Sequence, residues 1–356
     1  MQKINNYCWT FIKFLIAWAT CVVIIFCCWT HKKTDLLAIP YPPALINFNT
    51  SSQYLSSNLA SPCQLGNHIF ELASLYGLSK HLNRTPAFFI ESGYHKNMLD
   101  SIRSTMPGLI GKYAIFDGSV PTSLKETKFQ KVCCVYENPW NLKRSQHEYL
   151  HLTGKFYQSW KYFPNMREEL ISFLNTSVQN FGILPISNNN THVSCVHSRR
   201  GDFVEMNFYA TDPKFMKNAV KFLKEKENYS KKNQKIVLFG DDFKFMRNLF
   251  SEAKVSTDAH ESVEYYISQN SAIDDFLYSA YNCDEVLITA PRSTFGWWLG
   301  YFSKGDKVYY LDIKHARDRV YDNGEIAEND FFLPHWTPLK FAAAINFTVV
   351  ESGKVD

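Results

Sequence analysis

Short apolar runs alternate with amphipathic segments along most of the chain. Apolar residues at helical spacing, such as Leu65, Ile69 and Leu72, predict a helix, and similar stripes follow near 213–222 and 273–280. Strand-like runs lie at 87–90, 113–116, 132–136, 192–197, 236–239, 285–289 and 308–311. Strands that alternate with helices are typical of α/β folds. We expect two Rossmann-like domains facing a cleft, with a single Rossmann-like domain behind a long N-terminal extension as the alternative.

The first 60 residues have a different pattern. Residues 7–29 are apolar apart from Lys13, and about 20 apolar residues are what a bilayer-spanning helix requires. The run ends in bulky residues, without the small-residue site at which a signal peptide is cleaved. We therefore predict a cytosolic tail at 1–6, an uncleaved transmembrane signal-anchor at 7–29 and an irregular, proline-containing stem at 30–60.

Glycosylation sequons favour an orientation that the flanking lysines leave open. Six Asn-x-Ser/Thr sequences occur, at Asn49, Asn83, Asn175, Asn189, Asn228 and Asn346. They predict a short cytosolic tail and a glycosylated, lumenal body. Five cysteines lie beyond the predicted anchor, so one or two disulfides are expected in an oxidising lumen, with one thiol left over.

Composition narrows the function classes. The net charge of +4 is too small and too evenly spread to indicate nucleic-acid binding. Hydrophobic residues make up 46% of the chain, which excludes wholesale disorder. Aromatic residues reach 16%, which favours an aromatic-rich core over sugar-stacking surfaces. No Cys/His spacing indicates zinc.

Two segments place charged residues directly after predicted strands, where α/β sheets bind ligands. In 195–202 (CVHSRRGD), two arginines precede a glycine, and their guanidinium groups can hold a diphosphate or form a surface ion-pair cluster. In 237–242 (VLFGDD), a carboxylate can accept hydrogen bonds from guanine or ribose, hold a metal, or cap the next helix.

Two further segments place small or polar residues at predicted helix starts. In 287–298 (LITAPRSTFGWW), Ser293 and Thr294 lie where free N–H groups attract phosphate, although plain capping explains them as well. In 64–71 (QLGNHIFE), Gly66 permits close backbone approach to a ligand, or the segment is only a helix start.

Together these segments resemble the α-1,2-fucosyltransferase family, glycosyltransferase family 11. The resemblance rests on the order Gly-Asn-x-x-Phe-Glu-x-Ala, His-x-Arg-Arg-Gly-Asp, Phe-Gly-Asp-Asp and Ser-Thr-Phe-Gly-Trp-Trp. The segment 154–163 (GKFYQSWKYF) is also similar to divergent nematode-type members, and the resemblance covers about 61–314.

The resemblance implies a single-pass type II Golgi membrane enzyme with a GT-B-like body. An acceptor-side domain at 61–187 would precede a GDP-fucose-binding domain at 188–356. Such enzymes transfer L-fucose from GDP-β-L-fucose to a glycan hydroxyl, by default O-2 of a terminal β-galactoside. They invert the anomeric centre and need no metal or other cofactor. A homodimer through the stem or membrane segment is left open.

The resemblance also implies roles for individual residues. Arg199 and Arg200 would bind the diphosphate, with His197 and Asp242 near the guanine. Ser293 and Thr294 would contact the β-phosphate, and Gly66 and Asn67 would reach the donor from the opposite lobe. For the base that accepts the acceptor's proton, Asp202 is preferred over Glu205 and Asp241, although Asp202 can equally orient Arg199 or Arg200. Where many members have Gly-Asn-Gln followed by Met or Leu, this chain has Gly66-Asn67-His68-Ile69, which puts the acceptor preference in question.

Two rival functions are also compatible with this sequence. A Golgi sulfotransferase also grips phosphates, but residues 61–90 lack the glycine-rich phosphate loop that it would need. A catalytically inactive relative, acting as a membrane-anchored glycan- or nucleotide-sugar-binding protein, would keep the fold and lose turnover. The intact Arg199-Arg200 and Ser293-Thr294 pairs argue against that alternative.

Overall fold

The structure is a computed structural model of the 356-residue chain. It describes residues 53–121, 125–130, 132–154, 156–177, 181–227, 232–250, 264–342 and 347–353. The chain divides into two units, 1–50 and 51–356, and the fold below is that of the second. The predicted tail, anchor and most of the predicted stem lie outside the described residues. Within the described ranges, no helix has the length and apolar character needed to cross a bilayer.

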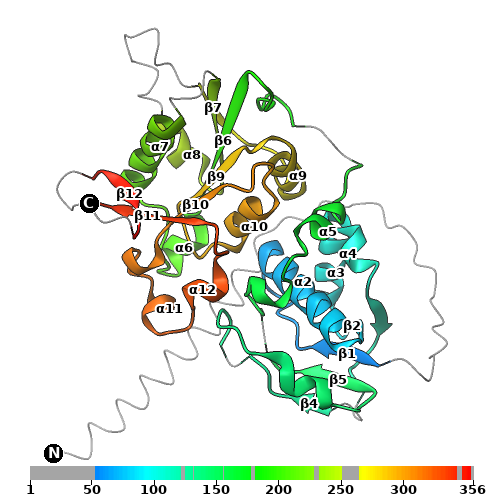
Figure 1. Cartoon of the computed structure of the whole chain (residues 1–356). Coiled ribbons are helices and arrows are strands. Elements are labelled where there is room, and N and C mark those ends of the chain that lie inside the picture. Colours follow the sequence, from blue (N-terminus) through cyan, green and yellow to red (C-terminus); the bar gives the residue numbers. More distant parts are fainter. Residues whose placement is uncertain are drawn as a thin grey trace, which may run out of the picture. The chain divides into compact units, whose positions relative to one another are not determined.

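The first sheet has five strands, all parallel, in the order β3-β2-β1-β5-β4. Its strands are β1 (Tyr54–Ser57), β2 (Thr85–Ile90), β3 (Ala114–Asp117), β4 (Lys125–Thr127) and β5 (Tyr149–Leu152). The main helices between them are α2 (Leu65–Leu82), α3 (Gly93–Thr105) and α4 (Pro107–Ile110), and the short α5 (Arg167–Ser172) follows the sheet (Figure 1).

Among the described residues, the second sheet has seven strands in the order β12-β11-β10-β9-β6-β7-β8, and only the β11–β12 pair is antiparallel. Its strands are β6 (Thr191–Ser198), β7 (Asn233–Gly240), β8 (Glu264–Ile267), β9 (Glu285–Ile288), β10 (Val308–Leu311), β11 (Thr337–Phe341) and β12 (Val349–Glu351). Its helices are α6 (Gly201–Glu205), α7 (Pro213–Glu227), α8 (Phe243–Phe250), α9 (Ala272–Asn282), α10 (Thr294–Phe302), α11 (Arg319–Asp322) and α12 (Glu328–Phe331).

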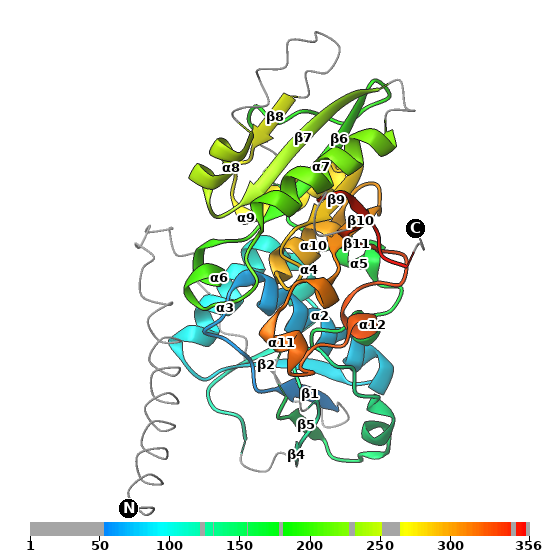
Figure 2. The same cartoon turned by 90° about the vertical axis from the view of Figure 1, so that its left-hand side faces the viewer.

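The two sheets are joined through helices α2 and α10, which lie side by side in both views (Figures 1 and 2). The ring of Phe70 on α2 lies 4.4 Å from Trp297 and 4.9 Å from Trp298, both fully buried on α10. One hydrophobic cluster therefore runs from the first sheet to the second. Burial of large aromatic rings provides most of the favourable free energy at such a contact.

Two parallel-dominated sheets in a mixed α/β chain confirm the α/β part of the predicted fold class, and the arrangement is consistent with the expected GT-B-like fold. The transmembrane helix that was part of the same prediction lies outside the described residues. The predicted helix at Leu65 is α2, and six of the seven predicted strands are present. Two disulfides, Cys133–Cys134 and Cys195–Cys283, agree with the expected one or two.

The predicted strand at 132–136 is wrong. The segment forms only an isolated bridge, between Cys134 and Ile326. Cys133 and Cys134 are bonded to each other, whereas successive side chains of a strand point to opposite faces and cannot meet.

The predicted stem extends too far into the chain, because Tyr54–Ser57 form β1, the central strand of the first sheet. Two serines in a four-residue segment hide the strand pattern. Their burial is tolerated because each hydroxyl has a partner: Ser56 Oγ lies 2.9 Å from His151 Nδ1, and Ser57 Oγ lies 2.6 Å from Tyr157 Oη.

Candidate functional site

The carboxyl ends of β6, β7 and β9 form the site. β6 pairs with β7 on one side and with β9 on the other, so the strand order reverses direction at this point. Ligands of α/β sheets bind outside the strand ends at such a switch point. The segments that follow these strands carry Arg199 and Arg200, Asp241 and Asp242, and Ser293 and Thr294.

Arg199 is held by carboxylates and by a residue of the first-sheet region. Its Nε and Nη2 donate to Asp202 Oδ1 and Oδ2, each at 2.9 Å, and Nε lies 3.3 Å from Asp241 Oδ2. Its Nη2 also donates to Gln64 Oε1 at 2.6 Å, and Gln64 Nε2 donates to Asp202 Oδ2 at 3.2 Å. Paired N–H bonds to one carboxylate fix the plane of a guanidinium. The three side chains thus connect the start of α2 to α6.

Asp202 therefore has the geometry of an orienting carboxylate, because both of its oxygens accept hydrogen bonds from Arg199 or Gln64. Of the other two candidate bases, Glu205 is exposed, and Asp241 accepts from the Arg200 backbone N–H at 2.9 Å.

Arg200 has partners different from those of Arg199, and its guanidinium stacks on an aromatic ring. Its guanidinium lies 4.3 Å from the centre of the Phe245 ring, and its Nη1 donates to Thr211 O at 2.8 Å. Its Nε lies 3.5 Å from Asp242 Oδ2. Cation–π stacking on α8 thus positions the second arginine beside the first.

Gly201 lies directly after the arginine pair, and a Cβ atom there would lie 2.8 Å from Asp241 Oδ2. Glycine therefore allows the Asp241 carboxylate to approach the start of α6. The resulting contacts hold the segments after β6 and β7 together.

His197 is buried against α10. Its Nε2 lies 3.3 Å from Ser293 Oγ, and a Cβ at Gly296 would lie 2.4 Å from its Nδ1. Burial, aided by the positive charge of Arg199, lowers the pKa of His197 to about 3. A neutral imidazole thus packs beneath the helix start.

The start of α10 meets the start of α2. Ser293 is the N-cap residue of α10, and its hydroxyl accepts from Gly296 N. Thr294 Oγ1 donates to Asn67 Oδ1 at 3.1 Å, and a Cβ at Gly66 would lie only 2.6 Å from Thr294 Oγ1. Glycine at position 66 is therefore what allows the two helix starts to touch.

The four segments singled out in the sequence are therefore neighbours. The chain matches the family described as Glycosyl transferase family 11 over residues 23–340. The chain belongs to glycosyl transferase family 11.

Curated relatives agree with this family. The chain is 65% identical over 353 residues to the Caenorhabditis elegans protein named "Putative galactoside 2-alpha-L-fucosyltransferase svh-11", covering 99% of this chain and 97% of that protein. Two further C. elegans proteins, each named "Galactoside 2-alpha-L-fucosyltransferase", are 32% and 30% identical, over 77% and 78% of this chain and 76% and 74% of their own lengths. The resemblance to nematode-type members is thus confirmed.

Sequence reasoning assigned no role to two residues of this family 11 site. Gln64 contacts Arg199 and Asp202, 135 and 138 positions further along the chain. The guanidinium of Arg292 lies 3.7 Å from the centre of the Phe208 ring, and its Nε lies 3.4 Å from Asp318 Oδ2. Gln64 lies in the segment 64–71 and Arg292 in the segment 287–298, and these positions were the only indication in the sequence that either residue belongs to the site.

Three predicted glycosylation sites lie among the described residues. Asn83 and Asn189 are exposed, whereas Asn175 is half-buried and its Nδ2 donates to Ser104 O at 2.9 Å. Asn49, Asn228 and Asn346 lie outside the described residues. In the same described part of the chain, no group of three or more His, Cys, Asp or Glu side chains is arranged to hold a metal.

Proposed function

We propose that this protein transfers L-fucose from GDP-β-L-fucose to a glycan hydroxyl, O-2 of a terminal β-galactoside, with inversion and without a metal. The proposal includes a Golgi location, as a single-pass type II membrane protein with a lumenal catalytic body. The names of its relatives and membership of glycosyl transferase family 11 support fucosyl transfer.

The arginine pair at the switch point carries the proposal. Arg199 Nη1 and Arg200 Nη2 donate to no described residue, although the other ends of both guanidinium groups are engaged. Two oriented, uncommitted donor groups suit the oxygens of a nucleoside diphosphate. Ser293 and Thr294, at the start of α10, lie where backbone N–H groups favour a phosphate.

The chemistry requires stabilisation of a leaving group. Displacement at the anomeric carbon passes through an oxocarbenium-like transition state, and negative charge grows on the departing GDP. Fixed guanidinium groups stabilise the transition state, in which this charge develops, more than they stabilise the ground state. Loss of one such donor raises the activation free energy by about 3–4 kcal/mol. The hydrogen bonds of Asp202 support an orienting role for it better than the role of base.

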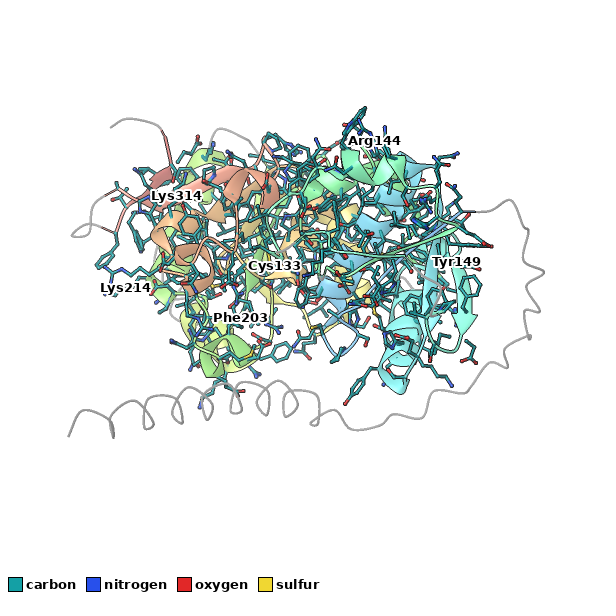
Figure 3. The ribbon with its side chains drawn as sticks, turned by 90° about the horizontal axis from the view of Figure 1, so that it is seen from below. Cys133, Arg144, Tyr149, Phe203, Lys214 and Lys314 are labelled. Carbon is teal, nitrogen blue, oxygen red and sulfur yellow. A yellow bond between two sulfur atoms is a disulfide. The ribbon has the colours of Figure 1, made fainter. Side chains whose placement is uncertain are left out.

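Calorimetric titration of the full-length chain with GDP-fucose tests the donor half of this proposal. We expect micromolar binding in EDTA, weaker binding of GDP-mannose, and loss of binding in Arg199→Ala. Arg144→Ala is the matched control, because Arg144 is exposed and lies in the segment Pro139–Arg144, on the opposite side of the view in Figure 3 from Phe203 of α6, the helix that follows the arginine pair.

A folded wild-type chain that fails to bind GDP-fucose, even with divalent metal restored, contradicts the proposal. If the chain binds GDP-fucose but releases no GDP with any member of a broad panel of galactose-terminated acceptors, the result would instead favour a catalytically inactive relative. The panel is scored by GDP release and by mass spectrometry of the products.

A further inference from the structure

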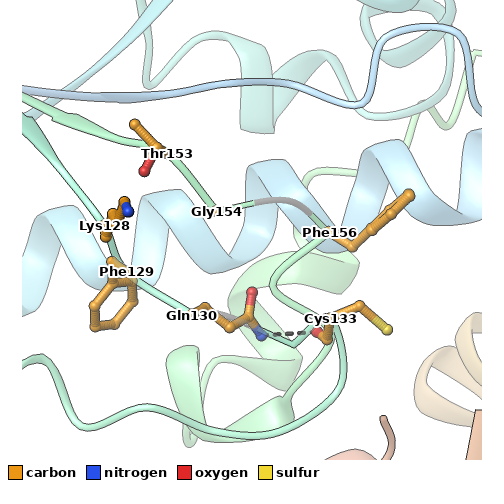
Figure 4. Close-up of a pocket in the computed structure, with 7 residues that line it drawn as sticks. All are labelled: Lys128, Phe129, Gln130, Cys133, Thr153, Gly154 and Phe156. Carbon is orange, nitrogen blue, oxygen red and sulfur yellow. Dashed lines mark hydrogen bonds between the residues drawn. The ribbon is translucent and has the colours of Figure 1, made fainter.

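The first-sheet region contains a second candidate site, separate from the arginine pair. It is a cavity of about 430 Å³, within the range of small-molecule sites. Its lining comes from the segments that follow β4 and β5, two adjacent parallel strands, so it too lies at the carboxyl ends of strands. The lining residues are Lys128, Phe129, Gln130, Cys133, Thr153, Gly154 and Phe156 (Figure 4).

Gln130 presents an unsatisfied acceptor to this cavity. Its side chain is 4% exposed, and its Nε2 donates to Cys133 O at 2.7 Å. Its Oε1 is buried and accepts a hydrogen bond from no described residue. In Figure 4 this oxygen is directed toward the chain at Thr153 and Gly154. Buried polar atoms nearly always have partners, so a lone acceptor that faces a cavity indicates a ligand that donates to it.

The remaining walls combine an aromatic face with polar groups. Phe156 is half-buried and has a φ of 71°, and its backbone N–H donates to the buried carboxylate of Glu71 at 2.7 Å. The Thr153 hydroxyl donates to Thr127 O at 3.4 Å and can still accept a hydrogen bond, and Lys128 is an exposed residue with a donor ammonium group. An apolar ring beside separate donors and acceptors matches a sugar residue, whose C–H groups line one face and whose hydroxyls both donate and accept.

Hydrogen bonds connect one wall of the cavity to the starts of α2 and α10. Gln158 N donates to Cys133 O at 2.9 Å, and Gln158 Nε2 donates to Asn67 Oδ1 at 2.8 Å. The same Asn67 oxygen accepts from Thr294, at the start of α10. Gln158 therefore links the cavity wall at Cys133 to the helix starts beside the proposed donor site.

We propose that this cavity binds a sugar residue of the glycan acceptor, next to the sugar that receives fucose. Gln130 Oε1 accepts a hydrogen bond from a sugar hydroxyl, and the Phe156 ring stacks on the sugar's apolar face. The assignment of this sugar to the acceptor rests on the proposed function, whereas glycan binding by the cavity does not.

Direct binding measurements on the full-length chain test this. The probes are a panel of neutral oligosaccharides that end in β-galactose, with methyl β-galactoside as a single-sugar probe and GDP-fucose as an independent ligand. We expect at least one oligosaccharide to bind more tightly than methyl β-galactoside. Gln130→Leu and Phe156→Ala should each weaken that oligosaccharide about tenfold or more and leave GDP-fucose affinity unchanged.

Two controls keep the test decisive. Gln269→Leu makes the same chemical change at an exposed position and should bind as the wild type does. Phe156→Ala removes a half-buried ring, so it preserves a folded chain if Gln130→Leu does not, and thermal melting checks both.

The outcomes separate the cavity from the proposed function. Wild-type affinities in both variants, or a wild type that binds no oligosaccharide of the panel, overturn the cavity proposal. Loss of glycan binding in the variants of a chain that does not bind GDP-fucose would uphold the cavity and contradict the proposed donor.

Discussion

At the scale of single residues, the site is a set of charges whose orientation is fixed by neighbours. Arg199 is held by Asp202, Asp241 and Gln64. His197 is kept neutral by burial, which lowers its pKa to about 3. Two consequences can be measured, one for the role of Asp202 and one for the stability of the fold.

Asp202→Asn distinguishes an orienting carboxylate from a base. An orienting role predicts weaker GDP-fucose binding together with lower kcat, because Arg199 loses a charged partner on two of its N–H groups. The acidic limb of the kcat–pH profile should persist. Glu225→Gln, the same type of change at an exposed position of α7, should resemble the wild type. A collapse of kcat with unchanged GDP-fucose affinity, and with loss of the acidic limb, would identify Asp202 as the base.

His197 should make the fold less stable at acid pH. Its pKa is about 3 in the folded chain, against the ordinary histidine value of 6.5 in the unfolded chain, so the unfolded chain binds the extra proton between those pH values. The contribution of neutral His197 to the free energy of unfolding is complete above pH 6.5. It is lost as the pH falls below 6.5, at about 1.4 kcal/mol per pH unit.

Denaturant titrations at several pH values check this. Burial also lowers the pKa of His68, to about 4, and raises that of Asp275 to about 7, with opposite effects on the slope. The comparison is therefore the slope of the wild type minus that of His197→Asn between pH 4.5 and 6. Equal slopes would show that His197 does not titrate in this way.

At the scale of elements, the contact between α2 and α10 decides whether the two halves of the site meet. Trp298 Nε1 donates to Gly66 O at 3.0 Å, and Thr294 contacts Asn67. Gly66 has no room for a side chain, since a Cβ would also lie 2.8 Å from Phe295 N. A backbone atom cannot move aside as the end of a flexible side chain can.

Gly66→Ala should therefore push the two helices apart. We expect it to destabilise the fold by about 1–3 kcal/mol, as overpacking does, and to weaken GDP-fucose binding. Gly93→Ala is the matched control, because a Cβ at Gly93 meets no atom of the described residues within 4 Å and α3 gains a better helix former. Thermal melting and calorimetry measure both changes. Equal effects of the two substitutions would contradict the close-contact argument.

At the scale of the whole described fold, one hydrophobic cluster links both sheets. Phe331 of α12 lies 5.9 Å from Phe70 of α2, ring centre to ring centre, and Ser159 Oγ donates to Asp330 O at 2.7 Å. A shared core predicts that the two sheets unfold together rather than one after the other.

Hydrogen exchange followed by mass spectrometry in rising denaturant tests this cooperativity. Peptides from β1 and β5 should lose protection at the same denaturant concentration as peptides from β6 and β9. Phe70→Ala should lower both midpoints equally, because its ring packs on both regions. Separate midpoints for the two sheets would show that the contact is not part of a common core.

The sequence predicted what depends on neighbouring positions. Apolar runs bounded by polar turns identified most strands. The Arg199-Arg200 and Asp241-Asp242 pairs could be located because each follows its strand directly, and Ser293-Thr294 because they stand at the start of an apolar helix. Strand prediction from the sequence was wrong where the local pattern was weak. β1 is half serine, and the apparent strand at 132–136 is interrupted by a disulfide between neighbours.

Tertiary structure decided which of these pieces meet. The order of parallel strands depends on packing between segments far apart in the chain, and this order sets the switch point between β6 and β9. The fold also brings Gln64 to Arg199 and places the Gln130 oxygen at a cavity. Neither arrangement could be predicted from the sequence, because each depends on segments that are not neighbours in the chain. The family motifs and the chemistry of the arginine pair were thus determined by the sequence, and the assembled site by the fold.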